Sequence, residues 1–148
     1  MGYNPNFRGT TAKGGATSLQ SLYQNGEVST ITKGKPVTVN ASGQSKLVNV
    51  SSEASVSAIV GVAAEDTPSA ANGQVLDCGR LENITTSFAV GTPVWIATDG
   101  SLTNIRPEAG VNGFVAGMYV VFVGVIVKNQ FNGLQKDLKV YMDLIGQL

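Results

Sequence analysis

One stretch near the end of the chain limits the folds that are open to it. Residues 119–127 read Tyr-Val-Val-Phe-Val-Gly-Val-Ile-Val, an uninterrupted apolar run rich in β-branched side chains. A membrane-spanning helix needs about 20 apolar residues, so this run is too short to cross a bilayer as a helix. It predicts a β-strand covered on both faces. The rest of the chain or a partner must provide that cover, because a bare strand of this kind pairs with other chains through its edge.

The remaining patterns also predict strands. Residues 36–40 alternate apolar and polar side chains, Ser42-Gly43 follows as a turn, and residues 46–50 return as the second arm of a hairpin. Residues 51–57 have room for a single helical turn behind a capping serine. Further strands are predicted at residues 58–63, 74–78, 84–88 and 138–145. The chain therefore predicts an all-β fold.

The strand patterns recur in the second half of the chain. Residues 34–43, Gly-Lys-Pro-Val-Thr-Val-Asn-Ala-Ser-Gly, match residues 91–100, Gly-Thr-Pro-Val-Trp-Ile-Ala-Thr-Asp-Gly, position by position. Ile-Val-Gly-Val at residues 59–62 is echoed by Phe-Val-Gly-Val at residues 122–125. Chance can produce one such match, but two in the same order favour an internal duplication. We expect two related β units packed into a compact β-sandwich or barrel.

Residues 1–30 are predicted to form an extended N-terminal arm ahead of a β domain at residues 31–148. Turn-forming sequences such as Asn4-Pro5-Asn6 dominate this segment, and its apolar side chains are too sparse to build a core. Such an arm either stays disordered or lies on another subunit, where its aromatic side chains dock in pockets. The candidate interface residues in the arm are Tyr3, Phe7, Arg8 and Tyr23.

The residue types present exclude several kinds of chemistry. The chain contains no histidine, which removes Ser–His and Cys–His catalysis and the commonest metal ligand. Cys78 is the only cysteine, so a zinc or iron–sulfur ligand set cannot be assembled. The adjacent acidic pair Glu65-Asp66 precedes a proline-containing loop and is best interpreted as a solvated turn. We expect no catalytic site, no metal and no cofactor.

The low charge of the chain favours a protein that makes contacts. Charged residues make up 14% of it and the formal net charge is zero, whereas about 25% is usual for soluble domains. A subunit largely covered by neighbours explains this, and the alternative is a monomer with a Ser/Thr/Asn-rich surface. Trp95, between Val94 and Ile96, is predicted to lie in the core or in a subunit interface. Clusters of Lys and Arg are absent from the sequence, so neither nucleic acid nor a membrane is an expected partner.

The half of the chain from Gly91 onward resembles small structural proteins of tailed bacteriophages. These proteins often carry a hairpin of the form Gly-x-Pro-Val-Φ-Φ-x-x-Asp-Gly-x-Leu-Thr, where Φ is an apolar residue, here at residues 91–103. A Gly-Val strand follows, here at residues 124–127. The opening Met-Gly-Tyr-Asn-Pro-Asn-Phe-Arg-Gly, residues 110–117 and the closing Leu-Ile-Gly-Gln-Leu also look like those of phage virion proteins. Head decoration (cement) proteins are the best-known members with this hairpin, and tail-fibre and baseplate adaptors carry similar modules.

The resemblance implies a capsid decoration protein on the virion head, assembled in the host cytoplasm. Such proteins are commonly trimeric, so the expected partners are further copies of this chain and the major capsid protein. One alternative is a tail, baseplate or fibre-anchoring adaptor of the virion. A further alternative is a glycan-binding β module that uses Trp95, Tyr119 or Tyr141 as a platform. An enzyme is the least favoured interpretation.

Overall fold

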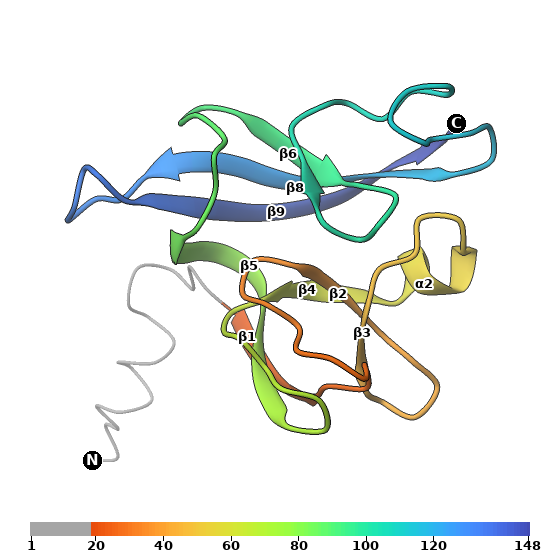
Figure 1. Ribbon diagram of the computed structural model, residues 1–148, viewed down its shortest axis with the longest axis horizontal. Coiled ribbons are helices and arrows are strands. Elements are labelled where there is room, and N and C mark those ends of the chain that lie inside the picture. Colours follow the sequence, from red (N-terminus) through yellow and green to blue (C-terminus); the bar gives the residue numbers. More distant parts are fainter. Residues whose placement is uncertain (1–18) are drawn as a thin grey trace, which may run out of the picture.

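The computed structural model describes residues 19–148, and antiparallel β-strands dominate that part of the chain (Figure 1). The nine strands are β1 (Leu19–Gln24), β2 (Pro36–Val39), β3 (Ser45–Leu47), β4 (Ile59–Ala63), β5 (Asn72–Ile84), β6 (Pro93–Ile96), β7 (Leu102–Thr103), β8 (Tyr119–Lys128) and β9 (Lys136–Gln147). A short helix, α2 (Glu53–Ser57), precedes β4. The predicted all-β fold is confirmed.

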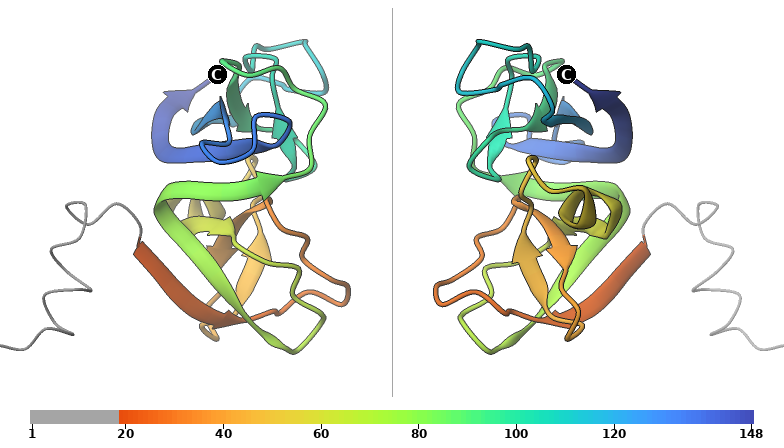
Figure 2. Two further views of the ribbon diagram at one scale, coloured as in Figure 1. Left: turned by 90° about the vertical axis from the view of Figure 1, so that its left-hand side faces the viewer. Right: turned by 90° about the vertical axis from the view of Figure 1, so that its right-hand side faces the viewer.

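The strands form one sheet in the order β3-β2-β4-β5-β9-β8-β6-β7, with β1 also paired to β5. The 13-residue strand β5 belongs to both halves of this sheet. Its first half pairs with β1 and β4, and its second half pairs with β9. Figures 1 and 2 show β5 running between a first unit, built from β1 to β4, and a second unit, built from β6 to β9.

The two units repeat one another in strand register. Val37 on β2 lies opposite Gly61 on β4, and Val94 on β6 lies opposite Gly124 on β8. In both units the register shifts directly after this pair, as it does at a β-bulge. The two related β units expected from the repeated sequence are therefore present in the backbone pairing.

Equivalent backbone hydrogen bonds are found at the start of each unit. The backbone N–H of Gly34 donates to the oxygen of Ala63 at 2.8 Å, and the N–H of Gly91 donates to the oxygen of Ile126 at 2.7 Å. Both glycines have a positive φ, 92° and 89°, a backbone conformation that costs other residues energy. The repeated Gly-x-Pro-Val sequence thus marks one structural feature, a glycine turn that leads into the first strand of a hairpin.

The repeated glycine inside β4 and β8 has a packing reason. A Cβ atom at Gly61 would lie 2.1 Å from the backbone oxygen of Leu76, and one at Gly124 would lie 1.9 Å from the backbone oxygen of Lys139. Both oxygens belong to the strand paired with the glycine. The absence of a side chain allows the two backbones to approach closely at the bulge.

One continuous core joins the two units. It includes Val56 from α2, Leu76 from β5 and Val123 and Ile126 from β8. A smaller cluster lies inside the first unit. The prediction that residues 119–127 are covered on both faces is only partly right, because Val121, Val123 and Ile126 are buried whereas Phe122, Val125 and Val127 stay partly exposed. The second face of β8 is therefore partly open to solvent.

Of two local predictions, the helical turn at residues 51–57 is confirmed and the strand at residues 84–88 is wrong. The helical turn expected at residues 51–57 is present as α2, and the side chain of Ser52 accepts a hydrogen bond from the backbone N–H of Ser55 at its start. The strand expected at residues 84–88 is absent, because β5 continues to Ile84 and residues 85–88 form a loop. Residues 85–88 do not pair with another strand.

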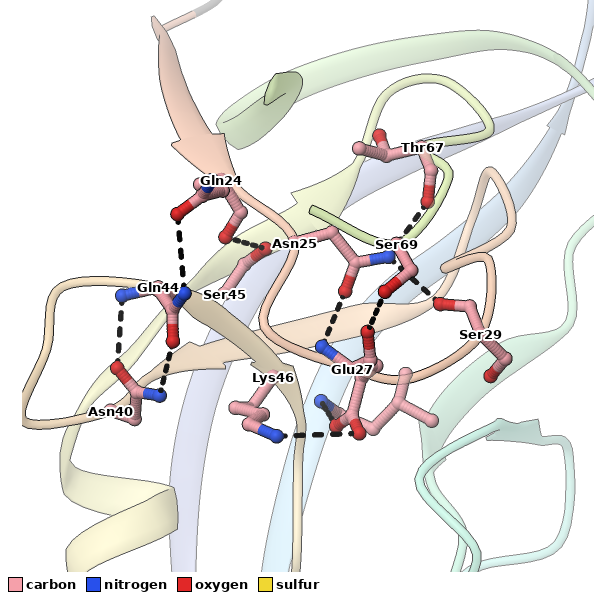
Figure 3. A network of polar contacts seen from close by, with 11 residues as sticks. Gln24, Asn25, Glu27, Ser29, Asn40, Gln44, Ser45, Lys46, Thr67 and Ser69 are labelled. Carbon is pink, nitrogen blue, oxygen red and sulfur yellow. Dashed lines mark hydrogen bonds and ion pairs between the residues drawn. The ribbon is translucent and has the colours of Figure 1, made fainter. Parts of the chain in front are cut away.

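A network of polar contacts attaches the segment after β1 to the first unit (Figure 3). Asn25 is almost fully buried at its centre. Its Nδ2 donates to the backbone oxygens of Ser29 at 2.9 Å and Thr67 at 2.8 Å, and its Oδ1 accepts from the backbone N–H of Glu27 at 2.7 Å. The carboxylate of Glu27 lies 3.6 Å from the ammonium of Lys46. This network fixes a segment that has little apolar surface of its own.

These contacts correct the boundary of the predicted arm. Residues 19–30 were expected to extend from the β domain, but β1 pairs with β5 along its whole length and the following residues are bonded into the first unit. Tyr23 is half-buried and packs against the cluster that contains Val75 of its own chain, so it is not free to dock on another subunit. The rest of the predicted arm, residues 1–18, lies outside the described residues.

Candidate interaction surface

The hairpin that joins β8 to β9 presents two large apolar side chains to solvent. Its loop, residues 129–135, lies at one end of the molecule (Figure 1). Phe131 is 84% exposed and Leu134 is 95% exposed. We call these two side chains the hairpin tip. Large apolar side chains exposed on a projecting loop are available to enter a pocket of a partner protein.

The hairpin tip is held by side-chain hydrogen bonds to the loop backbone. Asn129 is buried, and its Oδ1 accepts from the backbone N–H groups of Phe131 at 2.9 Å and Asn132 at 2.8 Å. The Oδ1 of Asn132 in turn accepts from the backbone N–H of Leu134 at 3.0 Å. Asparagine side chains commonly stabilise turns in this way. The two apolar side chains therefore project from a loop whose conformation is already set.

A buried carboxylate connects this loop to β5. Asp137 on β9 is fully buried, and its Oδ1 accepts from the Nδ2 of Asn129 at 2.9 Å and from the backbone N–H of Asn83 at 3.0 Å. Its Oδ2 lies 3.5 Å from the Nε of Arg80 without a hydrogen bond. The ion pair and the two hydrogen bonds offset part of the cost of removing the charge from water. The base of the hairpin is consequently fixed to the centre of the sheet.

Three aromatic rings cross the partly open face of the second unit. Trp95 on β6 lies 6.0 Å from Phe122 on β8, and Phe122 lies 6.5 Å from Tyr141 on β9, both with an interplanar angle of 73°. Edge-to-face contacts at such distances are favourable. Trp95 is half-buried and Tyr141 is 69% exposed. Trp95 thus lies outside the buried core clusters, on a face that is available for contact.

A cavity of about 650 Å³ lies beside this row of rings. Tyr141 and Lys139 of β9 line it together with Arg80 and Glu82 of β5, and Gln130 of the hairpin loop also lines it. Cys78 also lines the cavity and is partly exposed. Both charge signs and an aromatic ring are present, a mixture suited to polar ligands as well as to a protein side chain.

The candidate interface residues named from the sequence are not brought together. Trp95 lies in the second unit and Tyr23 packs in the first, while Tyr3, Phe7 and Arg8 lie outside the described residues. Sequence reasoning missed the hairpin tip altogether. The signal was present in Asn-Gln-Phe-Asn-Gly-Leu at residues 129–134, because apolar residues among turn formers between two strands are difficult to bury.

Residues 19–148 contain neither a metal-binding cluster nor a membrane-spanning helix. Within this part of the chain, no group of three or more His, Cys, Asp or Glu side chains is arranged to hold a metal ion. The single helix found there is far shorter and less apolar than a membrane-spanning helix must be.

No family model matches the chain, and no curated protein matches it significantly.

Proposed function

We propose that this chain is a structural protein without enzymatic activity, and that it decorates the capsid of a tailed bacteriophage. The observation that supports the proposal is the hairpin tip. Its side chains, Phe131 and Leu134, are exposed to solvent on a loop whose backbone is fixed by hydrogen bonds. Burying apolar surface stabilises an assembly by roughly 25 cal/mol per Å². A contact of this kind, repeated over many copies, would strengthen a shell against internal pressure.

The resemblance to virion proteins directs the proposal to the capsid. The residues that resemble virion proteins form the β6–β7 hairpin and the second half of β8. They therefore belong to the strands next to the β8–β9 loop. In this proposal the chain forms a homo-oligomer, a trimer, on the head surface and binds the major capsid protein. Residues 1–18 then clamp neighbouring subunits through Tyr3, Phe7 and Arg8.

Fractionation of virus particles tests this placement. Heads and tails are separated, and peptides of this chain are quantified in each fraction by mass spectrometry. We expect the chain in the head fraction, at many copies per particle. Recovery from tails alone would replace the capsid proposal with the tail, baseplate or fibre-anchoring adaptor, and absence from both fractions would reject a virion role.

Capsid occupancy tests the clamp separately. Purified capsids that lack the protein are incubated with the full chain or with a chain that begins at residue 19. We expect clearly lower occupancy for the shortened chain. Equal occupancy would reject the clamp and leave the hairpin tip as the remaining contact.

A glycan-binding module is a second candidate, favoured by the cavity beside Tyr141. An exposed ring next to Arg80, Glu82 and Gln130 offers a stacking surface and several hydrogen-bonding groups. Glycan array binding, with Tyr141→Ala as the matched variant, tests it. Micromolar binding that the variant loses would support a glycan site, and binding that the variant keeps would place the ligand elsewhere.

A further inference from the structure

We propose that Asn132 is a site of spontaneous deamidation, through which the hairpin tip gains a negative charge as the protein ages. The chain contains four Asn-Gly pairs, at residues 25–26, 72–73, 112–113 and 132–133. Asparagine followed by glycine is the pair most prone to this reaction, because glycine has no side chain to hinder its own backbone nitrogen. The inference does not depend on the proposed function, and it concerns a covalent change in the same loop.

The reaction needs only water and a base. The backbone nitrogen of the glycine loses its proton and bonds to the side-chain carbon Cγ of the asparagine, while the bond from Cγ to Nδ2 breaks and ammonia leaves. Water then opens the resulting cyclic imide. Addition at Cγ gives aspartate, and addition at the main-chain carbonyl carbon gives isoaspartate, whose backbone runs through Cγ. A reactive pair therefore needs a free glycine N–H and an asparagine side chain that can turn toward it.

The structure protects two of the four pairs. Asn25 is 1% exposed, and its side chain makes three hydrogen bonds to backbone groups. The N–H of Gly26 donates to the backbone oxygen of Ser45 at 2.9 Å. Asn72 and Gly73 lie within β5, and β1 pairs with this part of the strand. In both pairs the backbone must first leave its partners before the imide can form.

The pair at Asn112 and Gly113 is exposed but belongs to a tight turn. Both residues have a positive φ, 49° and 80°, and the N–H of Phe114 closes the turn on the backbone oxygen of Val111 at 3.0 Å. Phe114 is 2% exposed and belongs to the core. Formation of the imide changes the backbone at Asn112 and so disturbs a buried ring nearby. We therefore expect this pair to react more slowly than Asn132.

The pair at Asn132 and Gly133 leaves both reacting groups available. Both residues are exposed, and so are Leu134 and Gln135, so no buried side chain has to move when the imide forms. Within residues 19–148, the hydrogen bonds that fix this loop involve neither the N–H of Gly133 nor the Nδ2 of Asn132. The Oδ1 of Asn132 accepts from the N–H of Leu134 at 3.0 Å. Negative charge develops on this oxygen during the attack, and a donor at such a distance stabilises it.

The product changes the hairpin tip. Deamidation introduces a carboxylate between Phe131 and Leu134 in the sequence, and isoaspartate also lengthens the main chain by a methylene group. The longer backbone alters the turn in which the N–H of Gln135 donates to the backbone oxygen of Asn132 at 3.0 Å. A charge beside apolar side chains raises the cost of burying them. An apolar contact made by the tip is therefore weaker in the modified chain.

Peptide mapping of the full, folded chain tests the inference. The protein is kept in mildly alkaline buffer at body temperature, sampled over several weeks and digested briefly at mildly acidic pH, so that digestion itself adds little product. Mass spectrometry then measures the converted fraction of each pair. We expect Asn132 to convert first, at least about 10-fold faster than Asn25 and Asn72, which react only during local unfolding. The chain unfolded in guanidinium chloride is the matched control, and there the four rates should become similar.

Gly133→Ala tests the route of the reaction. The added methyl group hinders attack by the backbone nitrogen of residue 133, so conversion of Asn132 should slow several-fold while Asn112 keeps its rate. The variant should fold, because φ at Gly133 lies outside the left-handed region and an added Cβ meets only the flexible end of the Lys128 side chain. Circular dichroism checks the fold, and the comparison of folded and unfolded wild type does not depend on this variant.

Three results would overturn the inference. Conversion of Asn112 before Asn132 in the folded chain would show that the tight turn is no obstacle. Conversion of Asn25 or Asn72 as fast as Asn132 would show that the structure does not select this pair. An unchanged rate in Gly133→Ala would exclude attack by the backbone nitrogen. All three are measured on the isolated chain, so they leave the proposed place in the virion to its own test.

Discussion

The side-chain amide of Asn129 donates a 2.9 Å hydrogen bond to the carboxylate of Asp137 across the base of the β8–β9 hairpin. Both side chains are almost completely buried, and the same Asn129 accepts from the backbone N–H of Phe131. The position of an exposed apolar anchor is thus linked to a buried charge. Such preorganisation lowers the entropic cost of ordering a loop when it binds.

Removal of this carboxylate should destabilise the whole domain. Asp137→Ala removes the acceptor of Asn129 Nδ2 and of the backbone N–H of Asn83, and it leaves Arg80 without its ion-pair partner. We therefore expect the free energy of unfolding to fall by about 2–4 kcal/mol. Urea unfolding followed by the fluorescence of Trp95, the only tryptophan, measures it. Asp77→Ala, an exposed position on β5, should change the value by less than about 0.5 kcal/mol. Equal effects would contradict a buried role for Asp137.

The repeated glycine of each unit should not tolerate a side chain. In Gly124→Ala the new methyl group would overlap the backbone oxygen of Lys139, so we expect a loss of about 3 kcal/mol or more, or failure to fold. Gly61→Ala should behave alike, because the same overlap occurs with Leu76. The control is Gly110→Ala, where φ is 85° but the space is open, with an expected cost of about 1–2 kcal/mol. Similar losses at all three glycines would show that the close approach does not matter.

Replacement of Asn25 should release the segment that follows β1. Asn25→Ala removes two hydrogen bonds to backbone oxygens, one of them buried, and one from a backbone N–H. We expect the free energy of unfolding to fall by about 2–3 kcal/mol. Exchange of the backbone amide hydrogens of Glu27 and Thr67 should also become faster, because the Asn25 side chain is hydrogen-bonded to the backbone of both residues. Asn104→Ala, at an exposed position, is the control and should leave both measurements unchanged.

The turn between β6 and β7 predicts a small dependence of stability on acid. Hydrogen bonds from the side chain and the backbone of Ser101, with the charge of Lys35 nearby, lower the pKa of Asp99 below its usual value of 3.8. The folded state therefore gains stability above about pH 4, and this gain is lost as the pH falls through the lowered pKa. Between about pH 5 and about pH 2, the midpoint of urea unfolding should decrease less for Asp99→Asn than for the wild type. An unchanged acid profile would contradict the role of Ser101.

Local patterns were sufficient for much of the fold. The alternation in residues 36–40, the Gly-x-Pro-Val repeats and the run at residues 119–127 each depend on neighbouring residues only, and each corresponds to a strand or a turn in the structure. The register shared by the two units follows from the same repeats. The error at residues 84–88 arose because the residue types of a segment show only that a strand is possible, whereas pairing depends on a partner that lies far away in the sequence.

The sequence by itself determined an all-β chain with two related units, because side-chain periodicity and the backbone freedom of glycine act over a few residues. Only the tertiary structure decided that β5 serves both units, that Tyr23 packs inward and that Phe131 and Leu134 remain in water. Whether a side chain is buried depends on which distant strands lie beside it. Those contacts join residues dozens of positions apart, and no local pattern contains them.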